Sequence, residues 1–191
     1  MDALTLLHSR NSAPKLTEPG PDQQTLSSIL GAAVRAPDHA RLRPWRFLTI
    51  AGDARNRLGD LFVIAGEKRK QAKGEGALLE QEEQKYRAQP LRAPLMVVVI
   101  GCIKEHPKVP AIEQMLSAGC AAHAILLAAQ AHGFAGIWRT GDNAFDEVVK
   151  EGLGLAVNEE IVGFLYIGSI DGHYKPLATM ALEDYCQLWQ G

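Results

Sequence analysis

The sequence predicts a three-layer fold of the α/β or α+β class, in which helices cover both faces of a sheet of about four strands. Segments whose apolar residues recur every three or four positions alternate with short runs rich in β-branched residues. The chain has 191 residues, 47% hydrophobic and 22% charged, which is the size and composition of one globular domain. No internal repeat is visible, so we predict a single domain over residues 1–191.

The helices follow from this periodicity. The clearest covers Asp22–Ala36, where Asp22 can serve as the N-cap and the next residue, a proline, stops the helix. Ile112–His132 is long enough for a helix of about 30 Å and is crowded with small residues that allow another backbone to approach closely. Gly133 ends it in the manner of a C-cap. The remaining helices are predicted at Ala54–Arg69, at Asp146–Gly152 and in a short amphipathic segment that Arg10 and Ser12 close.

Four strands are predicted between these helices. Leu95–Cys102 and Ile161–Ser169 contain few polar residues, which is typical of strands covered on both faces. Arg46–Ala51 and Gly136–Arg139 are shorter and have the same β-branched and aromatic character. These runs supply the central layer of the predicted fold.

Two segments do not fit the alternation. Residues 67–89 are strongly charged and broken by glycines, and we expect a solvated helical excursion or a mobile lid rather than a second domain. Residues 173–191 have no regular pattern but carry Tyr174, Tyr185 and Trp189. Because exposing such aromatic side chains is costly, we expect this tail to dock, with a second subunit as one candidate surface.

The charge distribution limits the classes of partner. The net charge of −2, from 20 basic and 22 acidic residues, provides no field that would recruit nucleic acid or a membrane. Residues 1–50 nevertheless carry six basic and four acidic side chains, and four of the basic ones fall between Arg35 and Arg46. This local excess favours a small anionic ligand over a polyanion, which needs a longer basic stripe.

The cysteines and the first residues limit the chemistry and the location. The three cysteines are odd in number and widely spaced, so neither a disulfide framework nor a metal site is expected. The first ten residues lack the basic and apolar regions of a signal peptide, and the longest apolar stretch contains histidines and glycines. We therefore expect a soluble cytoplasmic protein that contacts no membrane and no nucleic acid.

Three short polar segments interrupt the apolar structure, whereas the usual nucleotide-loop and hydrolase motifs are absent from the sequence. Arg10-Asn11-Ser12 offers charge-assisted donors of the kind that hold a phosphate, or an arginine that meets carbonyls at a helix end. Residues 35–45 form a proline-stiffened loop with arginines, a histidine and a tryptophan, suited to lying along a flat ring, although the tryptophan alone favours a core position. In residues 136–141, Arg139 is an anion ligand or a partly buried structural cation.

These same residues carry a resemblance to a known family. The chain resembles the FMN-dependent nitroreductases at four runs of residues. They are Arg10-Asn11-Ser12, Ala-Pro-Asp-His at residues 36–39, Pro-Trp-Arg-Phe at residues 44–47, and Gly136-Ile137-Trp138-Arg139-Thr140-Gly141. The small-residue helix at 118–121 and the late strand at 161–168 fit the same ordered pattern. The chain is most similar to the short, single-domain NAD(P)H nitroreductase subgroup. The resemblance implies an α+β nitroreductase-like fold with a mixed central sheet of four to five strands, and a homodimer with FMN at the subunit interface.

The resemblance also implies the site residues. FMN would be held on one subunit by Arg10, Asn11 and Ser12 at its phosphate and ribityl end and by Trp138, Arg139 and Thr140, while Arg35 and His39 would reach it from the partner subunit. Contacts with NAD(P)H would fall on Ala128, Ala129, Gln130, Ala131, His132 and Gly133, where core packing is the alternative reading. Because Asn11 stands where many relatives have an arginine, the cation facing the flavin pyrimidine edge stays open among Lys15, Arg35 and Arg43.

The implied function is hydride transfer from NAD(P)H through FMN to a nitroaromatic, quinone or similar small acceptor by a ping-pong mechanism. Flavin carries such chemistry, so the protein needs no strong base or nucleophile and no catalytic side chain is expected. Two alternatives stay open: a flavin-binding or flavin-modifying protein on the same fold without nitroreductase turnover, and an anion-binding domain that holds no flavin.

Overall fold

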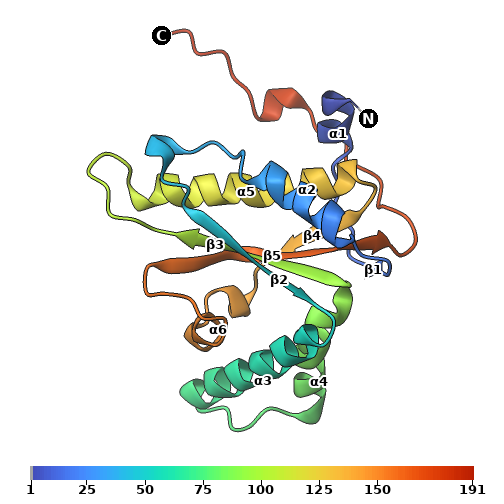
Figure 1. Ribbon diagram of the computed structural model, residues 1–191, viewed down its shortest axis with the longest axis vertical. Coiled ribbons are helices and arrows are strands. Elements are labelled where there is room, and N and C mark those ends of the chain that lie inside the picture. The colour runs from blue at the N-terminus through green and yellow to red at the C-terminus, as the bar shows by residue number, and fades with distance from the viewer. Residues whose placement is uncertain (1) are drawn as a thin grey trace.

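A computed structural model describes residues 2–191 and contains a central sheet between two layers of helices (Figure 1). The sheet has five strands: β1 (Leu16–Thr17), β2 (Trp45–Ala51), β3 (Leu95–Cys102), β4 (Ala135–Arg139) and β5 (Glu159–Ile170). One layer holds α1 (Ala3–Ser9), α2 (Gln23–Ala33) and α5 (Ala111–Ala131), and the other holds α3 (Ala54–Lys73), α4 (Glu80–Ala88) and α6 (Glu147–Gly152). The predicted three-layer α+β class with a sheet of four to five strands is confirmed.

Every strand pairing in the described residues is antiparallel, so the expectation of a mixed sheet was wrong for this chain. The strands lie in the order β1-β5-β3-β2, and β4 pairs with β5 as well. Ala51, the last residue of β2, lies opposite Leu95, the first residue of β3. The helical segment between these strands therefore returns the chain to the end of the sheet that it left, and β3 must run back against β2.

The helix ends follow local capping rules. The carboxylate of Asp22 accepts a hydrogen bond from the amide of Thr25 at 2.8 Å, as expected of the N-cap of α2. This helix ends at Ala33, three residues earlier than predicted. At the end of α5, Gly133 has a φ of +84° and the amide of Phe134 donates to the carbonyl of Ala129 at 2.9 Å, which is the Schellman arrangement.

Residues 67–89 are helical over most of their length. The helix α3 continues to Lys73, ends at Gly74 in the left-handed conformation, and is followed by α4, which packs along it. Gly59 and Gly66 lie on the contact, where added Cβ atoms would lie 2.8 Å from the carbonyl oxygen of Arg87 and 2.6 Å from the ring of Tyr86. We call this pair of helices the α3–α4 hairpin.

The core consists of two apolar clusters, one on each face of the sheet. Val97 and Val99 of β3 face α2 and α5, whereas Met96, Val98 and Ile100 face α3 and α6. All five side chains are fully buried, which confirms that β3 is covered on both faces. α5 is long and apolar enough to cross a membrane by length and composition, but its buried face packs on this sheet and makes it a core helix.

Residues 171–191 are exposed and leave the body of the domain, with one 3₁₀ turn at Leu182–Asp184 (Figure 1). Trp189 is 87% exposed and Tyr185 is 70% exposed. One fixed point is the side-chain amide of Asn11, which donates to the carbonyl of Lys175 at 2.6 Å. Among residues 2–191 of one chain, no apolar surface therefore covers the aromatic residues at the end of the tail.

Candidate functional site

β4 pairs with β5 and directs successive side chains to opposite faces of the sheet. Ile137 packs into the cluster below the sheet, and Trp138 into the cluster beside α2 and α5. The indole Nε1 of Trp138 donates to the carbonyl of Val162 at 3.2 Å. Gly163 makes this approach possible, because a Cβ there would lie 2.0 Å from that nitrogen.

An apolar groove of roughly 660 Å³ lies along Trp138 on the α2 and α5 side of the sheet. Its lining includes Ala32, Arg35, Leu116, Gly119, Leu127 and Trp138. The groove is wide because the side chains of α5 that line it include small ones. Among the described residues, Arg35 is the only arginine or lysine in its lining. The groove therefore offers a flat apolar wall with one cation.

A second cavity, of roughly 450 Å³, lies at the end of β4 on the side of the α3–α4 hairpin. Its lining includes Lys85, Arg92, Trp138, Arg139, Thr140 and Tyr166, and we call it the cationic cavity. The guanidinium carbon of Arg139 lies 6.0 Å from the centre of the Tyr166 ring. Its Nε is buried and has no hydrogen-bond partner among residues 2–191. A buried donor without a partner is costly, which indicates that a ligand completes this site.

The turn after β4 is held against the hairpin by a polar network. Arg69 donates to the side-chain carbonyl of Asn143 at 3.0 Å and pairs with Asp146. The amide of Asn143 in turn donates to Gln89 at 3.1 Å. A smaller cavity of roughly 310 Å³ lies along this network and shares Lys85, Gln89 and Thr140 with the cationic cavity. This network therefore holds Gln89 and Asn143, two of the residues that line the cationic cavity.

The residues Arg10, Asn11 and Ser12 lie beside the beginning of β4. The amide of Ala13 donates to the carbonyl of Gly136 at 3.1 Å, and the side chain of Gln130 donates to Ser9 at 2.9 Å. All three residues are half-buried. The fold thus brings the first polar segment next to the third one, at the opposite end of β4 from Arg139.

The predicted residues Arg35 and His39 lie apart from this cluster within one chain. Arg35 follows α2 and lines the apolar groove together with Trp138. His39 is exposed in a 3₁₀ turn, where its Nε2 is 3.9 Å from a carboxylate oxygen of Glu113. Neither residue lines the cationic cavity.

The residues assigned to NAD(P)H, from Ala128 to Gly133, form the last turn of α5 and its cap. Ala129 is fully buried, and the ring of His132 shares a hydrogen bond of 2.9 Å with the hydroxyl of Ser28 on α2. These contacts hold the end of α5 against its neighbours. They show packing, and a binding role for this segment stays a prediction.

Comparison with known proteins decides the family. The profile described as "Nitroreductase family" matches residues 8–169. The chain belongs to the nitroreductase family. It is 43% identical over 173 residues to "Putative NAD(P)H nitroreductase YdjA" of Escherichia coli K12, covering 88% of each chain. It is 38% identical over 170 residues to "Putative NAD(P)H nitroreductase" of Haemophilus influenzae, covering 88% of this chain and 89% of the relative.

Solved structures confirm the fold of this nitroreductase-family chain. A nitroreductase-like family protein from Bacillus cereus superposes with a TM-score of 0.82 at 21% identity, over 100% of this chain and 97% of that one. The FMN- and NADPH-dependent nitroreductase NfnB of a Sphingopyxis strain matches over the full length of both chains, with a TM-score of 0.76 at 21% identity. At these identities, the likeness extends to the fold.

Sequence reasoning on this nitroreductase-family chain missed Lys85 and Arg92. Both lie in or next to the charged segment 67–89, whose composition is typical of a solvated helix. The open candidates Lys15 and Arg43 are exposed and line neither the groove nor the cationic cavity. The one signal in the sequence is that Arg92 lies three residues before the buried strand β3, which keeps its backbone close to the sheet.

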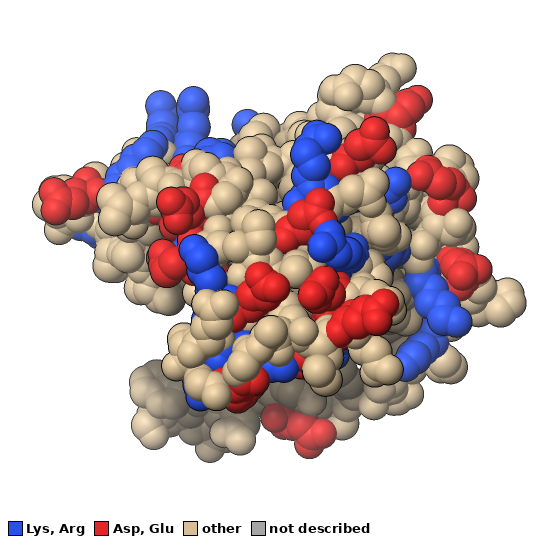
Figure 2. All heavy atoms as spheres, turned by 90° about the horizontal axis from the view of Figure 1, so that it is seen from below, with Lys and Arg blue, Asp and Glu red and all other residues tan. Residues whose placement is uncertain are grey.

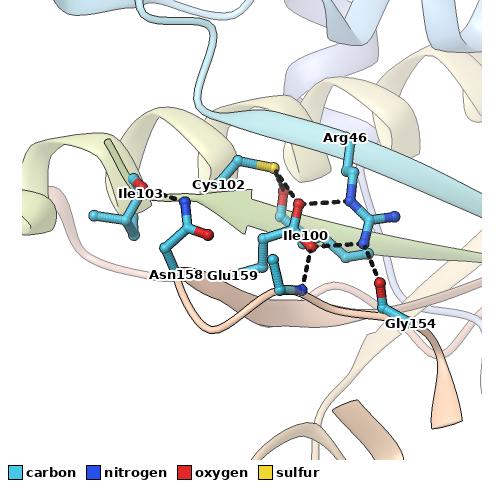
Figure 3. A network of polar contacts seen from close by, with 8 residues as sticks. Arg46, Ile100, Cys102, Ile103, Gly154, Asn158 and Glu159 are labelled. Carbon is cyan, nitrogen blue, oxygen red and sulfur yellow. Dashed lines mark hydrogen bonds and ion pairs between the residues drawn. The ribbon is translucent and has the colours of Figure 1, made fainter. Parts of the chain in front are cut away.

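A further polar cluster lies at the far end of the sheet (Figure 3). Arg46 and the thiol of Cys102 both point at the carboxylate of Glu159, and the amide of Ala156 donates to it at 2.9 Å. The hydrogen bonds from Arg46 lower the pKa of Glu159 to about 2, whereas burial and the neighbouring carboxylate raise the pKa of Cys102 to about 11. This thiol therefore stays protonated, and the cluster is structural. Residues 2–191 contain no group of three His, Cys, Asp or Glu side chains placed to hold a metal ion.

Proposed function

We propose that this chain is an FMN-dependent oxidoreductase that takes hydride from NAD(P)H and reduces a nitroaromatic, quinone or similar small acceptor. The named activity of the two bacterial relatives at 43% and 38% identity supports the NAD(P)H nitroreductase class. The observation that supports a bound cofactor is the buried Nε of Arg139, which has no hydrogen-bond partner among residues 2–191. Arg139 lines a cavity together with Trp138 and Thr140. Bound FMN would supply the hydrogen-bond acceptor that this Nε lacks.

The residues present fit a flavin mononucleotide. A planar apolar ring suits the groove beside Trp138, and its anionic end requires donors such as the half-buried segment Arg10–Ser12. The side chains of Arg10, Arg35 and Arg139 make no hydrogen bond or ion pair with any other residue in the part of the chain that the structure describes. FMN would be held by Arg10, Asn11, Ser12, Trp138, Arg139 and Thr140.

The proposal includes a homodimer in which Arg35 and His39 contact FMN on the partner subunit. The outer face of α5 exposes Ile112 and Leu116, at 65% and 62%, next to the apolar groove. A second copy that covers this face would remove apolar surface from water and place its own Arg35 near the ligand. The tail, with Tyr185 and Trp189 exposed, would dock on the same partner.

Bound flavin would supply the hydride chemistry, and the tasks left to the protein are binding, orientation and charge. A cation close to the ring stabilises negative charge that develops on it and so favours hydride acceptance. We assign this task to Arg139 at the end of β4, because its Nε is buried and has no partner among residues 2–191. The last turn of α5, Ala128–Gly133, is the proposed contact for NAD(P)H. Solubility and a cytoplasmic location belong to the proposal.

The visible spectrum of the purified protein tests the proposal. We expect flavin absorption bands that disappear when NADH or NADPH is added without oxygen and return when a nitroaromatic or quinone is added. Steady-state rates should then give parallel double-reciprocal lines, the signature of a ping-pong cycle. Flavin that stays oxidised would favour a flavin-binding protein without turnover. A colourless protein that takes up no added FMN would contradict the cofactor assignment itself.

A further inference from the structure

The cationic cavity has an unusual balance of charge for this chain. Its lining contains Lys85, Arg92 and Arg139 but no aspartate or glutamate, although the whole chain has a net charge of −2. Elsewhere on the outer face seen in Figure 2, side chains of both signs are interspersed. Three cations around one cavity without a counter-charge form a site for an anion.

Three cations of the α3–α4 hairpin are paired with acids, whereas Lys85 of the same hairpin lines the cavity. Lys70 binds Glu82 at 2.7 Å, Arg69 pairs with Asp146, and Arg87 pairs with Asp60. In residues 2–191, no hydrogen bond or ion pair engages the side chains of Lys85, Arg92 or Arg139. The carboxylates of Glu82 and Glu83, which precede Lys85, are engaged by Lys70 and Arg87. Two cations next to paired neighbours are thus available to a ligand.

Side-chain hydrogen bonds and burial hold residues in the wall of the cationic cavity in place. Gln89 is held by Asn143, which Arg69 holds in turn. The phenol of Tyr166 is largely buried beside the cavity, and burial raises its pKa against the opposing charges of Arg92 and Arg139. The phenol therefore stays neutral and keeps its O–H as a donor. An anion here would meet three cations and a hydroxyl in a shielded setting.

The cavity lies at the other end of β4 from the proposed phosphate site. The segment Arg10–Ser12 joins β4 next to Gly136, whereas Arg139 and Thr140 follow three residues later. At about 3.3 Å per residue, these positions are about 10 Å apart along the strand. A single phosphate held at the first position therefore cannot also neutralise the second.

We propose that the cationic cavity binds a negatively charged group, a carboxylate or sulfonate, on the electron acceptor, so that anionic nitroaromatics and quinones are the favoured substrates. Trp138 lines both this cavity and the groove proposed for the flavin ring, and Arg139 and Thr140 are proposed ligands of FMN. An acceptor anchored at Lys85 and Arg92 would therefore lie next to the cofactor site. This inference rests on the proposed function for the reaction, but the anion site itself is independent of turnover.

The test compares an acceptor pair that differs in one charge, 4-nitrobenzoate and its methyl ester. We expect Arg92→Gln and Lys85→Gln each to lower kcat/KM for 4-nitrobenzoate about tenfold, because each removes one charge-assisted contact. The value for the methyl ester should change less than about twofold. The matched control is Arg57→Gln, an exposed arginine of α3 that lines none of the cavities described above, and it should alter neither substrate.

Equilibrium dialysis of 4-nitrobenzoate against the purified protein separates the two claims. Binding that Arg92→Gln weakens about tenfold supports the anion site even where NAD(P)H is not oxidised, and the proposed function alone would then fail. Equal binding of acid and ester, or equal losses of kcat/KM for both, would overturn the anion site. A loss confined to FMN retention or to the KM for NADPH would also overturn it, because the cavity would then hold a phosphate of the cofactor or of the donor.

Discussion

The guanidinium of Arg46 on β2 donates hydrogen bonds of 2.7 and 2.6 Å to the two carboxylate oxygens of Glu159 at the start of β5. These strands do not pair with each other, because β3 lies between them. The ion pair therefore crosses one strand and ties the edge of the sheet to its centre, with the thiol of Cys102 on β3 donating to the same carboxylate at 3.2 Å.

Acid should remove the contribution of this pair to stability. The pKa of Glu159 is lowered to about 2 from 4.5, so its stabilisation is fully present above about pH 4.5 and is lost as the pH falls through 2. We expect Glu159→Gln to lower the free energy of unfolding by about 2 kcal/mol at pH 7, since the side chain is 12% exposed. Urea denaturation at pH 7 and pH 3 should show this difference shrinking in acid.

Glu160→Gln is the control for that experiment. Its side chain is 48% exposed and pairs with Lys150 at 3.1 Å, so its loss should cost below about 1 kcal/mol. A difference between wild type and Glu159→Gln that stays constant from pH 7 to pH 3 would contradict the assignment.

The α3–α4 hairpin should not tolerate a methyl group at its contact. Gly59→Ala places a Cβ 2.8 Å from the backbone oxygen of Arg87, and we expect it to lower the free energy of unfolding by about 2 kcal/mol despite the better helix propensity of alanine. Gly31→Ala in α2 meets no atom within 4 Å and should stabilise by about 0.5–1 kcal/mol. Chemical denaturation of both variants measures whether each change in the free energy of unfolding is a loss or a gain. A stabilising Gly59→Ala would refute the close packing of α3 against α4.

Flavin affinity should depend on Arg139. Replacing it with alanine removes a buried cationic donor, and we expect FMN to bind at least about tenfold more weakly in a flavin-fluorescence titration. Arg10→Ala should act in the same direction, whereas Arg57→Ala should leave the affinity unchanged. Variants of Arg139 that purify fully yellow with unaltered affinity would remove this residue from the cofactor site.

Self-association should depend on the tail. Replacing both Tyr185 and Trp189 with alanine removes side chains that are 70% and 87% exposed in one chain, and we expect the dimer dissociation constant to rise at least about tenfold. Val157→Ala removes a fully exposed apolar side chain from the turn before β5 and serves as the control. Analytical ultracentrifugation gives both constants. An unchanged dimer in the tail variant would show that the tail docks elsewhere.

Local features of this protein were predictable from its residues alone. The buried strand at 95–102, the cap at Asp22 and the end of α5 at Gly133 were predicted correctly, because hydrophobic periodicity and capping act within a few residues. The ordered polar segments also predicted the family, which the profile match over residues 8–169 confirms.

Only the tertiary structure decided how these elements meet. The direction of β3 depends on where the α3–α4 hairpin returns the chain. Lys85 and Arg92 reach the cavity of Arg139 only because that hairpin packs on the same face of the sheet. Such placements arise from contacts between residues dozens of positions apart, and no local periodicity records them. The sequence of a charged helical segment therefore does not show the role of each cation. The packing of the folded domain determines which cations line a cavity and which form ion pairs with acidic side chains.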